Sequence, residues 1–204
     1  MGLKLLISLG LIILSYLYGS IPFALVVGKL FYKTDIRNQG SGNLGGTNAG
    51  RVLGAKAGVA VIVLDASKTI ISMLVSLNIA KIFGISSDII YLSALACIIG
   101  HCYPIFAGFR GGKAVSVAIG YALFVNFWAG LFGLLVFFIV LKLTKYVSLS
   151  SISGTAGVLV ISPFVGFSPI GIFTNAVILA LMTYKHKDNI VRLKEGTERK
   201  ITWM

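Results

Sequence analysis

Acidic side chains are scarce in this chain. Its 204 residues include only 6 Asp and Glu against 18 Lys and Arg, and only 12% of the residues are charged. Hydrophobic residues make up 57% of the chain and the mean hydropathy is +0.95, which excludes an ordinary soluble domain. With 2 Cys and 2 His, the sequence offers no disulfide framework and no cluster of metal ligands. We expect a membrane protein without a metal site.

Several common catalytic motifs are also missing. The segment Arg110-Gly-Gly-Lys113 is similar to a nucleotide-binding P-loop, but Ala107 and Ala114 break that pattern. Phe106 and Val191 stand where a His-x-x-x-x-Asp acyltransferase motif would need Asp. No Gly-x-Ser-x-Gly nucleophile elbow is present either. Nucleotide binding and Ser–His–Asp hydrolysis are therefore disfavoured.

Long apolar runs dominate the remainder of the chain. A transmembrane helix needs about 20 apolar residues, and breaks near Asn126 and between Pro163 and Pro169 divide the two longest C-terminal runs. No small-residue cleavage site follows a short first core, so we expect the first helix to be retained. The predicted fold is all-α and integral to the membrane, with seven transmembrane helices over 4–28, 57–80, 88–104, 113–125, 127–144, 147–162 and 169–185.

Basic residues orient these spans, since Lys and Arg gather on the cytoplasmic side of a membrane protein. Seven spans place nine loop residues and the six basic residues of the tail on one face, fifteen in all, and leave Lys4 and Lys81 on the other. We therefore predict an N-terminus outside and a C-terminus in the cytoplasm. This topology and anionic headgroups explain the net charge of +12, so no nucleic-acid partner is expected.

Three polar segments fall on the predicted cytoplasmic face of this single domain: 38–54, 100–116 and 184–198. Glycine lets backbone N–H groups approach an oxyanion closely, and a helix that starts at Lys113 would add its dipole. The segments thus predict a site for phosphate-like ligands. Ordinary turn chemistry with basic anchors is the alternative for each segment alone. A transporter or binding protein for phosphorylated metabolites is the alternative function, although alternating access usually needs a midplane site.

Structural roles are predicted for three titratable side chains, Asp65, Lys68 and His101. Asp65 and Lys68 lie three residues apart in the second span, where a buried ion pair is the favoured interpretation and a direct substrate role the alternative. His101 precedes Pro104 and has no acidic partner nearby in sequence. His186 is followed at i+3 by Asn189, which places the two on one face of a continued helix.

The chain resembles the bacterial acyl-phosphate:glycerol-3-phosphate acyltransferases (PlsY). The resemblance rests on three stretches in the family's order: Gly40-Ser-Gly-Asn-Leu-Gly-Gly-Thr-Asn48 with Arg51, Gly100 through Lys113, and Tyr184 through Leu193 with Gly196 and Glu198. The second stretch departs from the family pattern at Ala114, where the family often has glycine. Together the matches span almost the whole chain.

The resemblance implies transfer of a fatty acyl group from acyl phosphate to the 1-hydroxyl of sn-glycerol 3-phosphate. The products would be 1-acylglycerol 3-phosphate and phosphate, in phospholipid biosynthesis at the bacterial cytoplasmic (inner) membrane. Because acyl phosphate is already activated, no cofactor is implied; the partners are acyl phosphate, glycerol 3-phosphate and membrane lipid.

The same resemblance implies roles for individual residues. Acyl phosphate would be held by Gly111, Gly112 and Lys113. The reacting groups would be positioned or polarised by Ser41, Asn43, Thr47 and Asn48, which with Lys113 form the expected catalytic set. Glycerol 3-phosphate would be bound by Arg51, His186, Asn189 and Arg192.

Overall fold

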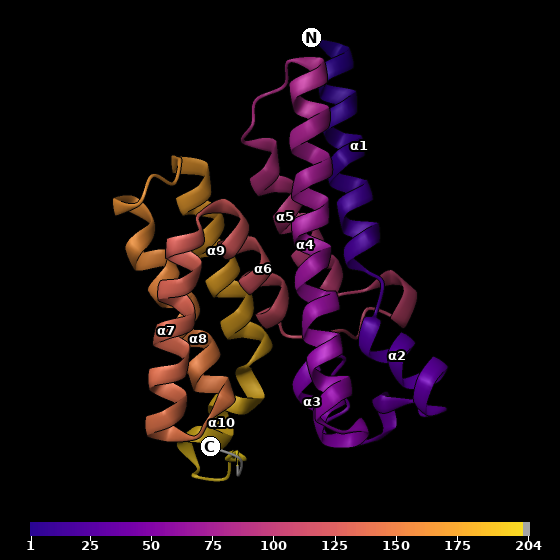
Figure 1. The fold of residues 1–204 in the computed structure, drawn as a ribbon, viewed down its shortest axis with the longest axis vertical. Coiled ribbons are helices and arrows are strands. Elements are labelled where there is room, and N and C mark those ends of the chain that lie inside the picture. Colours follow the sequence, from indigo (N-terminus) through magenta and orange to yellow (C-terminus); the bar gives the residue numbers. More distant parts are fainter. Residues whose placement is uncertain (202–204) are drawn as a thin grey trace. The chain divides into compact units, whose positions relative to one another are not determined.

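The computed structural model describes residues 1–201, and within that range every regular element is helical. The chain divides into two compact units, Met1–Tyr121 and Ala122–Met204, with the boundary inside one helix. Figure 1 shows the fold of both units. An all-α fold was predicted, and the described residues confirm it.

The first unit is built on three apolar helices that pack on one another (Figure 1): α1 (Gly2–Gly19), α4 (Ala55–Phe83) and α5 (Ile89–Cys102). Between α1 and α4 lie α2 (Phe23–Tyr32), the 3₁₀ turn η1 (Ile36–Asn38) and α3 (Gly46–Leu53). A second 3₁₀ turn, η2 (Ile105–Ala107), follows α5 and precedes α6 (Val115–Val125).

The predicted first span, 4–28, was wrong as one continuous helix. The chain leaves the helical path between α1 and α2, over residues 20–22, where Pro22 has no N–H and cannot continue the ladder. Carbonyl oxygens at this break need donors, because apolar surroundings supply none. The buried Lys68 of α4 supplies them: its Nζ donates to Gly19 O at 3.1 Å and to Ile21 O at 2.8 Å.

Glycine lets α3 fold back tightly against the start of α4. Gly54, at φ +97°, forms the turn between the two helices. Gly50 and Gly58 face each other across it, and a Cβ on Gly58 would lie 2.8 Å from Gly50 Cα. The small-residue spacing Gly50-x-x-x-Gly54-x-x-x-Gly58 is thus used for close helix contact.

The second unit contains the C-terminal end of α6 followed by α7 (Phe127–Thr144), α8 (Val147–Ile161), the 3₁₀ turn η3 (Ser162–Phe164), α9 (Pro169–Lys185) and α10 (Lys187–Lys194). The predicted breaks are confirmed. Asn126 caps α7 by accepting a hydrogen bond from Ala129 N, and Ser168 caps α9, which begins at Pro169.

Five apolar segments are long enough to cross a bilayer by length and composition: Gly2–Tyr32, Ala55–Phe83, Ile89–Ala107, Phe127–Thr144 and Val147–Phe164. Two more are shorter: α6 has 11 residues and α9 has 17. At about 1.5 Å per residue, α6 alone is shorter than a hydrocarbon core of roughly 30 Å. The seven-span count and its orientation stay predictions.

Candidate active site

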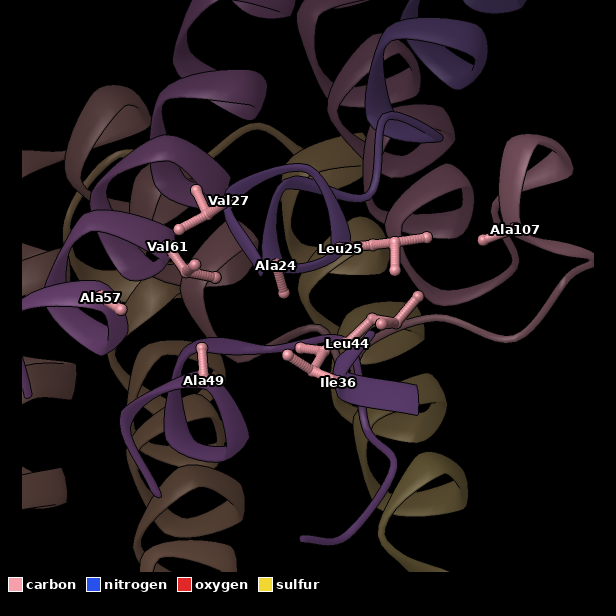
Figure 2. Packing of buried hydrophobic residues seen from close by; sticks show 9 residues of the cluster. All are labelled: Ala24, Leu25, Val27, Ile36, Leu44, Ala49, Ala57, Val61 and Ala107. Atoms are coloured by element: carbon pink, nitrogen blue, oxygen red, sulfur yellow. The ribbon is translucent and has the colours of Figure 1, made fainter. Parts of the chain in front are cut away.

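A small apolar core brings the first two polar segments together at one end of the first unit. Leu44, from the glycine-rich loop, and Ala107, from the turn before the second motif, belong to the same buried cluster as Ile36 and Ala49 (Figure 2). Helices α2 and α4 complete it through Ala24, Leu25, Val27, Ala57 and Val61. The 38–54 and 100–116 segments therefore pack on the same buried cluster, although they lie far apart in sequence.

Asn48 fixes the shape of the glycine-rich loop from below. Its side chain is 1% exposed, its Oδ1 accepts from Ser41 N at 2.8 Å, and its Nδ2 donates to the carbonyl oxygens of Ile36 and Gln39. Gly40 has a φ of +63°, and a Cβ there would lie 2.3 Å from Asn48 Oδ1. Glycine is required at this position by both its backbone conformation and the nearby amide.

The remaining candidates of this loop lie at its rim and on α3. Ser41, Thr47 and Arg51 are exposed and Asn43 is half-buried. Thr47 lies in the first turn of α3 and Arg51 one turn later. This places hydroxyl, amide and guanidinium groups on one short stretch of chain around a buried Asn48.

Asp35, next to this loop, is occupied by two basic side chains. Its carboxylate accepts hydrogen bonds from Arg37 and lies 3.6 Å from Lys29 Nζ, and it also caps η1. The hydrogen bonds from Arg37 hold the pKa of Asp35 well below its usual range. Asp35 is therefore a structural anion and does not supply a base.

The Gly111-Gly112 turn packs directly against His101. Gly112 N donates to His101 O at 3.0 Å. A Cβ on Gly112 would lie 2.0 Å from His101 Nε2, and one on Gly111 would lie 2.1 Å from His101 O. No larger residue fits either position without displacing its neighbours.

Lys113 does not begin a helix, and that expectation was wrong. Helix α6 starts two residues later, at Val115, because the intervening Ala114 adopts a left-handed φ of +67°. Phe109 has a similar φ of +61°. Left-handed backbone is unfavourable for residues with a Cβ, so this loop holds two non-glycine residues in strained conformations.

Asp65, Lys68 and His101 form a buried cluster beneath the same turn. The predicted Asp65–Lys68 pair is confirmed: Lys68 Nζ lies 2.9 Å from Asp65 Oδ1, and the two side chains are 0% and 1% exposed. His101 Nδ1 lies 3.5 Å from both Asp65 Oδ1 and Lys68 Nζ. His101 thus has an acidic neighbour, which the local sequence does not reveal because Asp65 lies 36 positions earlier on another helix.

The third segment belongs to the second unit, where Glu198 organises it. Glu198 accepts hydrogen bonds from Asn189 at 2.6 Å, Arg192 at 2.8 Å and Ser148 at 2.8 Å. Partial burial raises the pKa of Glu198, but the hydrogen bonds from Asn189, Ser148 and Arg192 outweigh burial and hold the pKa below its usual range. Glu198 was not among the predicted site residues, although it lies in the third motif segment.

His186 sits at the bend between α9 and α10 rather than inside a helix. Its ring is buried, and its Nδ1 lies 2.8 Å from Met182 O, a carbonyl that can only accept. Nδ1 therefore carries the hydrogen, which leaves Nε2 as the acceptor in the neutral ring. Within the second unit, His186 and the Asn189–Arg192–Glu198 group lie at the same end of α9.

Among residues 1–201, no group of three or more His, Cys, Asp or Glu side chains could hold a metal ion. The polar side chains of the motif segments are mainly cations, amides and hydroxyls, a donor set that suits phosphate oxygens.

Comparison with known proteins identifies the family. The family model described as "Glycerol-3-phosphate acyltransferase" matches residues 9–196. A protein named glycerol-3-phosphate acyltransferase from Listeria monocytogenes serotype 4a (strain HCC23) is 46% identical over 196 residues, which is 94% of this chain and 96% of the relative. The chain belongs to the glycerol-3-phosphate acyltransferase family.

Other members of the glycerol-3-phosphate acyltransferase family match it over a similar extent. Glycerol-3-phosphate acyltransferase 2 of Bacillus anthracis is 45% identical over 93% of this chain and 97% of its own length. A crystal structure of PlsY (YgiH), an integral membrane glycerol 3-phosphate acyltransferase in its glycerol 3-phosphate form, matches with a TM-score of 0.88 and 41% identity, covering 96% of each chain. The lysophosphatidic acid form of PlsY matches with a TM-score of 0.86.

Proposed function

We propose that this protein transfers a fatty acyl group from acyl phosphate to the 1-hydroxyl of sn-glycerol 3-phosphate. The hydroxyl oxygen attacks the acyl carbonyl carbon, an ester C–O bond forms, and the bond between the carbonyl carbon and the phosphate oxygen breaks. The hydroxyl proton passes to the leaving phosphate. The products are 1-acylglycerol 3-phosphate and inorganic phosphate, so the step balances without a cofactor or an enzyme nucleophile.

The observation that best supports this proposal is that two loops suited to binding anions pack on the same buried cluster, in a chain of this family. The Leu44–Ala107 core carries both the glycine-rich loop and the Gly111-Gly112 turn. Acyl phosphate and glycerol 3-phosphate each carry a phosphate, which backbone N–H groups and basic side chains bind well. Electrostatic stabilisation by such preorganised donors is commonly the largest contribution to acyl transfer.

In this proposal, Gly111, Gly112 and Lys113 hold the phosphate of the donor. Gly112 N–H already donates to His101 O, so Gly112 contributes the shape of the turn, and Lys113 contributes the cation. Ser41, Asn43 and Thr47 orient the hydroxyl or polarise the carbonyl. For Asn48 we propose an indirect role in place of direct contact with substrate, because its amide groups are engaged by loop backbone.

Glycerol 3-phosphate is bound, in this proposal, by Arg51, His186, Asn189 and Arg192. Arg51 offers a guanidinium suited to bidentate phosphate contact. His186 is held by the hydrogen bond between its Nδ1 and Met182 O, and Glu198 holds Asn189 and Arg192 in a fixed arrangement.

We further propose seven crossings of a bacterial cytoplasmic membrane, an outside N-terminus and a single domain whose three motif segments face the cytoplasm. The fifteen-to-two distribution of basic residues supports this topology. The short helices α6 and α9 cross the membrane in this arrangement, which locally thinned lipid or shielding by neighbouring helices permits.

The test is an assay of purified protein with acyl phosphate and glycerol 3-phosphate, in the presence of a metal chelator. We expect release of phosphate together with formation of 1-acylglycerol 3-phosphate, identified by mass spectrometry, and no release without the acceptor. Robust turnover with acyl-CoA and none with acyl phosphate would contradict the proposed donor while leaving the acyltransferase family assignment intact.

A further inference from the structure

His101 is the nearest neighbour of the Gly111-Gly112 turn on two sides. Its backbone carbonyl accepts the hydrogen bond from Gly112 N at 3.0 Å. The three atoms nearest to a Cβ built on Gly112 all belong to the imidazole: Nε2 at 2.0 Å, Cε1 at 2.5 Å and Cδ2 at 2.9 Å. The ring is therefore in contact with the Gly112 backbone, and it limits how far that backbone can move inward.

The imidazole itself is held from behind by the buried ion pair. Lys68 Nζ donates hydrogen bonds to Gly19 O and Ile21 O and forms an ion pair with Asp65 Oδ1 at 2.9 Å. His101 Nδ1 lies 3.5 Å from Lys68 Nζ and 3.5 Å from Asp65 Oδ1. Both members of the ion pair therefore face Nδ1, and Nε2 is the ring nitrogen turned toward Gly112.

Four pieces of chain meet at this cluster. Lys68 ties the break between α1 and α2 to α4, and Asp65 ties α4 to the end of α5 through His101. Phe23, at the start of α2, adds a ring 5.2 Å from Lys68 Nζ. A buried charged network of this kind is costly to maintain in an apolar surrounding, which indicates a role beyond filling space.

We infer that His101 is a positioning residue for the donor-binding turn, held in place by Asp65 and Lys68. The side-chain contacts that link Lys68, Asp65 and His101 set the location of Gly111 and Gly112, and thereby the position of the acyl-phosphate head. This inference rests on the proposed function only in assigning acyl phosphate to the turn; the contact between His101 and Gly112 is independent of it.

Second-site suppression tests the inference, because the two glycines meet different parts of His101. In Gly112→Ala the new methyl meets the imidazole ring, so shortening that side chain removes the obstruction. In Gly111→Ala the methyl meets His101 O and Pro104 Cδ, at 2.1 and 2.5 Å, which no change of the His101 side chain removes. Gly111→Ala is therefore the matched control.

His101→Asn is the suppressor variant. Its amide keeps a polar group in the place of Nδ1, facing Asp65 and Lys68, while the atoms corresponding to Nε2 and Cε1 are absent. His101→Ala is a second suppressor that removes the whole ring. Measurement of the thermal unfolding midpoint of each purified variant separates a repositioned turn from a lost fold.

We expect Gly112→Ala to raise KM for acyl phosphate by roughly tenfold, with a much smaller change in KM for glycerol 3-phosphate. Because Gly112 and His101 are in contact, the effects of substitutions at the two positions should not simply add. His101→Asn/Gly112→Ala should recover most of that loss, and His101→Asn/Gly111→Ala should recover none. Losses that simply add in the first double variant would overturn the inference. So would equal recovery of both glycine variants, since that indicates general loosening.

Amide hydrogen exchange over residues 108–114 provides a readout without turnover. Exchange should speed up in Gly112→Ala and slow down again in His101→Asn/Gly112→Ala. If the unmodified protein releases no phosphate from acyl phosphate, the proposed function fails, and exchange still decides whether His101 positions the turn. If the unmodified protein is active but exchange and KM show no specific suppression, the inference alone is wrong.

Discussion

Asn189 Nδ2 donates to Glu198 Oε1 at 2.6 Å, across nine positions of the chain. The same carboxylate receives Arg192 through its other oxygen and Ser148 of α8 through Oε1. Glu198 therefore connects the tail of the protein to α8 and fixes two of the residues proposed to bind glycerol 3-phosphate. The glutamate acts through its neighbours and is not itself suited to phosphate contact.

Replacement of Glu198 by Gln should raise KM for glycerol 3-phosphate more than KM for acyl phosphate. The amide can keep one acceptor for Asn189 but loses the charge that holds Arg192. Loss of a charge-assisted hydrogen bond costs about 1.5–3 kcal/mol, so we expect roughly a tenfold or larger change. Glu195→Gln, an exposed glutamate nearby, is the control and should have no such effect. A larger effect on the acyl phosphate KM would contradict this assignment.

Glu198 also predicts a direction of pH dependence. Its pKa in the folded protein lies below the usual value of about 4.3 for an unperturbed glutamate. The stabilisation is therefore fully present above the unfolded pKa and is lost as pH falls through the lower, folded value. Thermal unfolding midpoints of the unmodified protein and Glu198→Gln should converge as pH is lowered; a difference that stays constant down to strongly acidic pH would exclude this linkage.

Lys68→Met should destabilise the first unit strongly. The change leaves Asp65 buried at 1% exposure without its cation and removes donors from Gly19 O and Ile21 O. Breaking one side of a buried pair costs about 3–5 kcal/mol. Asp65→Asn/Lys68→Met should recover part of the loss, because no isolated charge remains. Lys81→Met, an exposed lysine of the same helix, is the control for thermal unfolding in detergent.

Apolar runs and helix-breaking residues in the sequence predicted the helices well, but they did not predict the contacts between the helices. The break at Asn126 and the start of α9 at Pro169 follow from local chemistry, namely a side-chain cap and an N-terminal proline, and both were predictable. Pro22 carried an equally local signal. It was read as part of one span because the donor that satisfies the broken backbone, Lys68, lies 46 positions away from it.

Roles of individual site residues were less accessible for the same reason. In the sequence, Asn48 is indistinguishable from an amide that contacts substrate. Only the fold reveals that its three hydrogen bonds hold the backbone of the glycine-rich loop. His101 had no acidic neighbour in sequence, although α4 places Asp65 beside it. Motif residues could be listed from the sequence, whereas the division between direct contact and positioning depends on non-local packing.

Ala114→Gly should be nearly neutral for stability, unlike an ordinary alanine-to-glycine change. Left-handed backbone costs a residue with a Cβ roughly 1–2 kcal/mol, which offsets the loss of a buried methyl and the added chain entropy of glycine. Ala118→Gly, inside α6, lacks that compensation and should cost about 1–2 kcal/mol. Similar decreases in the thermal unfolding midpoint for both variants would contradict the strained conformation of Ala114.

The seven-span topology predicts which single cysteines an impermeant maleimide reaches from each side. Cysteines replacing Asn38, Arg110 and Glu195, all exposed, should be labelled from the cytoplasm, and one replacing Ser87 from outside. The probe position in this loop must be chosen with care, because nearby Ile36 is fully buried in the core of Figure 2 and a cysteine there would not be labelled. The native Cys97 and Cys102 are buried at 0% exposure, so labelling reports the introduced thiol. Labelling of position 195 from outside would exclude an odd number of spans with an external N-terminus.

Lys113→Ala and His186→Asn should separate binding of the two substrates. Removing the cation that directly follows Gly111-Gly112 should weaken use of acyl phosphate most, because in the proposed site Lys113 supplies positive charge to the donor phosphate. His186→Asn keeps a donor for Met182 O, 2.8 Å from the present Nδ1, but has no base that titrates near neutral pH. We therefore expect its main effect in KM for glycerol 3-phosphate.

If His186 were instead the essential base, the kinetics would differ in kind. His186→Asn would then depress kcat sharply at saturating acceptor and abolish the acidic limb of the pH–rate profile. We favour the binding role, because His186 Nδ1 is hydrogen-bonded to a backbone carbonyl and the leaving phosphate can take the proton. Steady-state kinetics with each substrate varied separately, over a range of pH, decide between the two. A pure kcat defect in His186→Asn means that the histidine is the base.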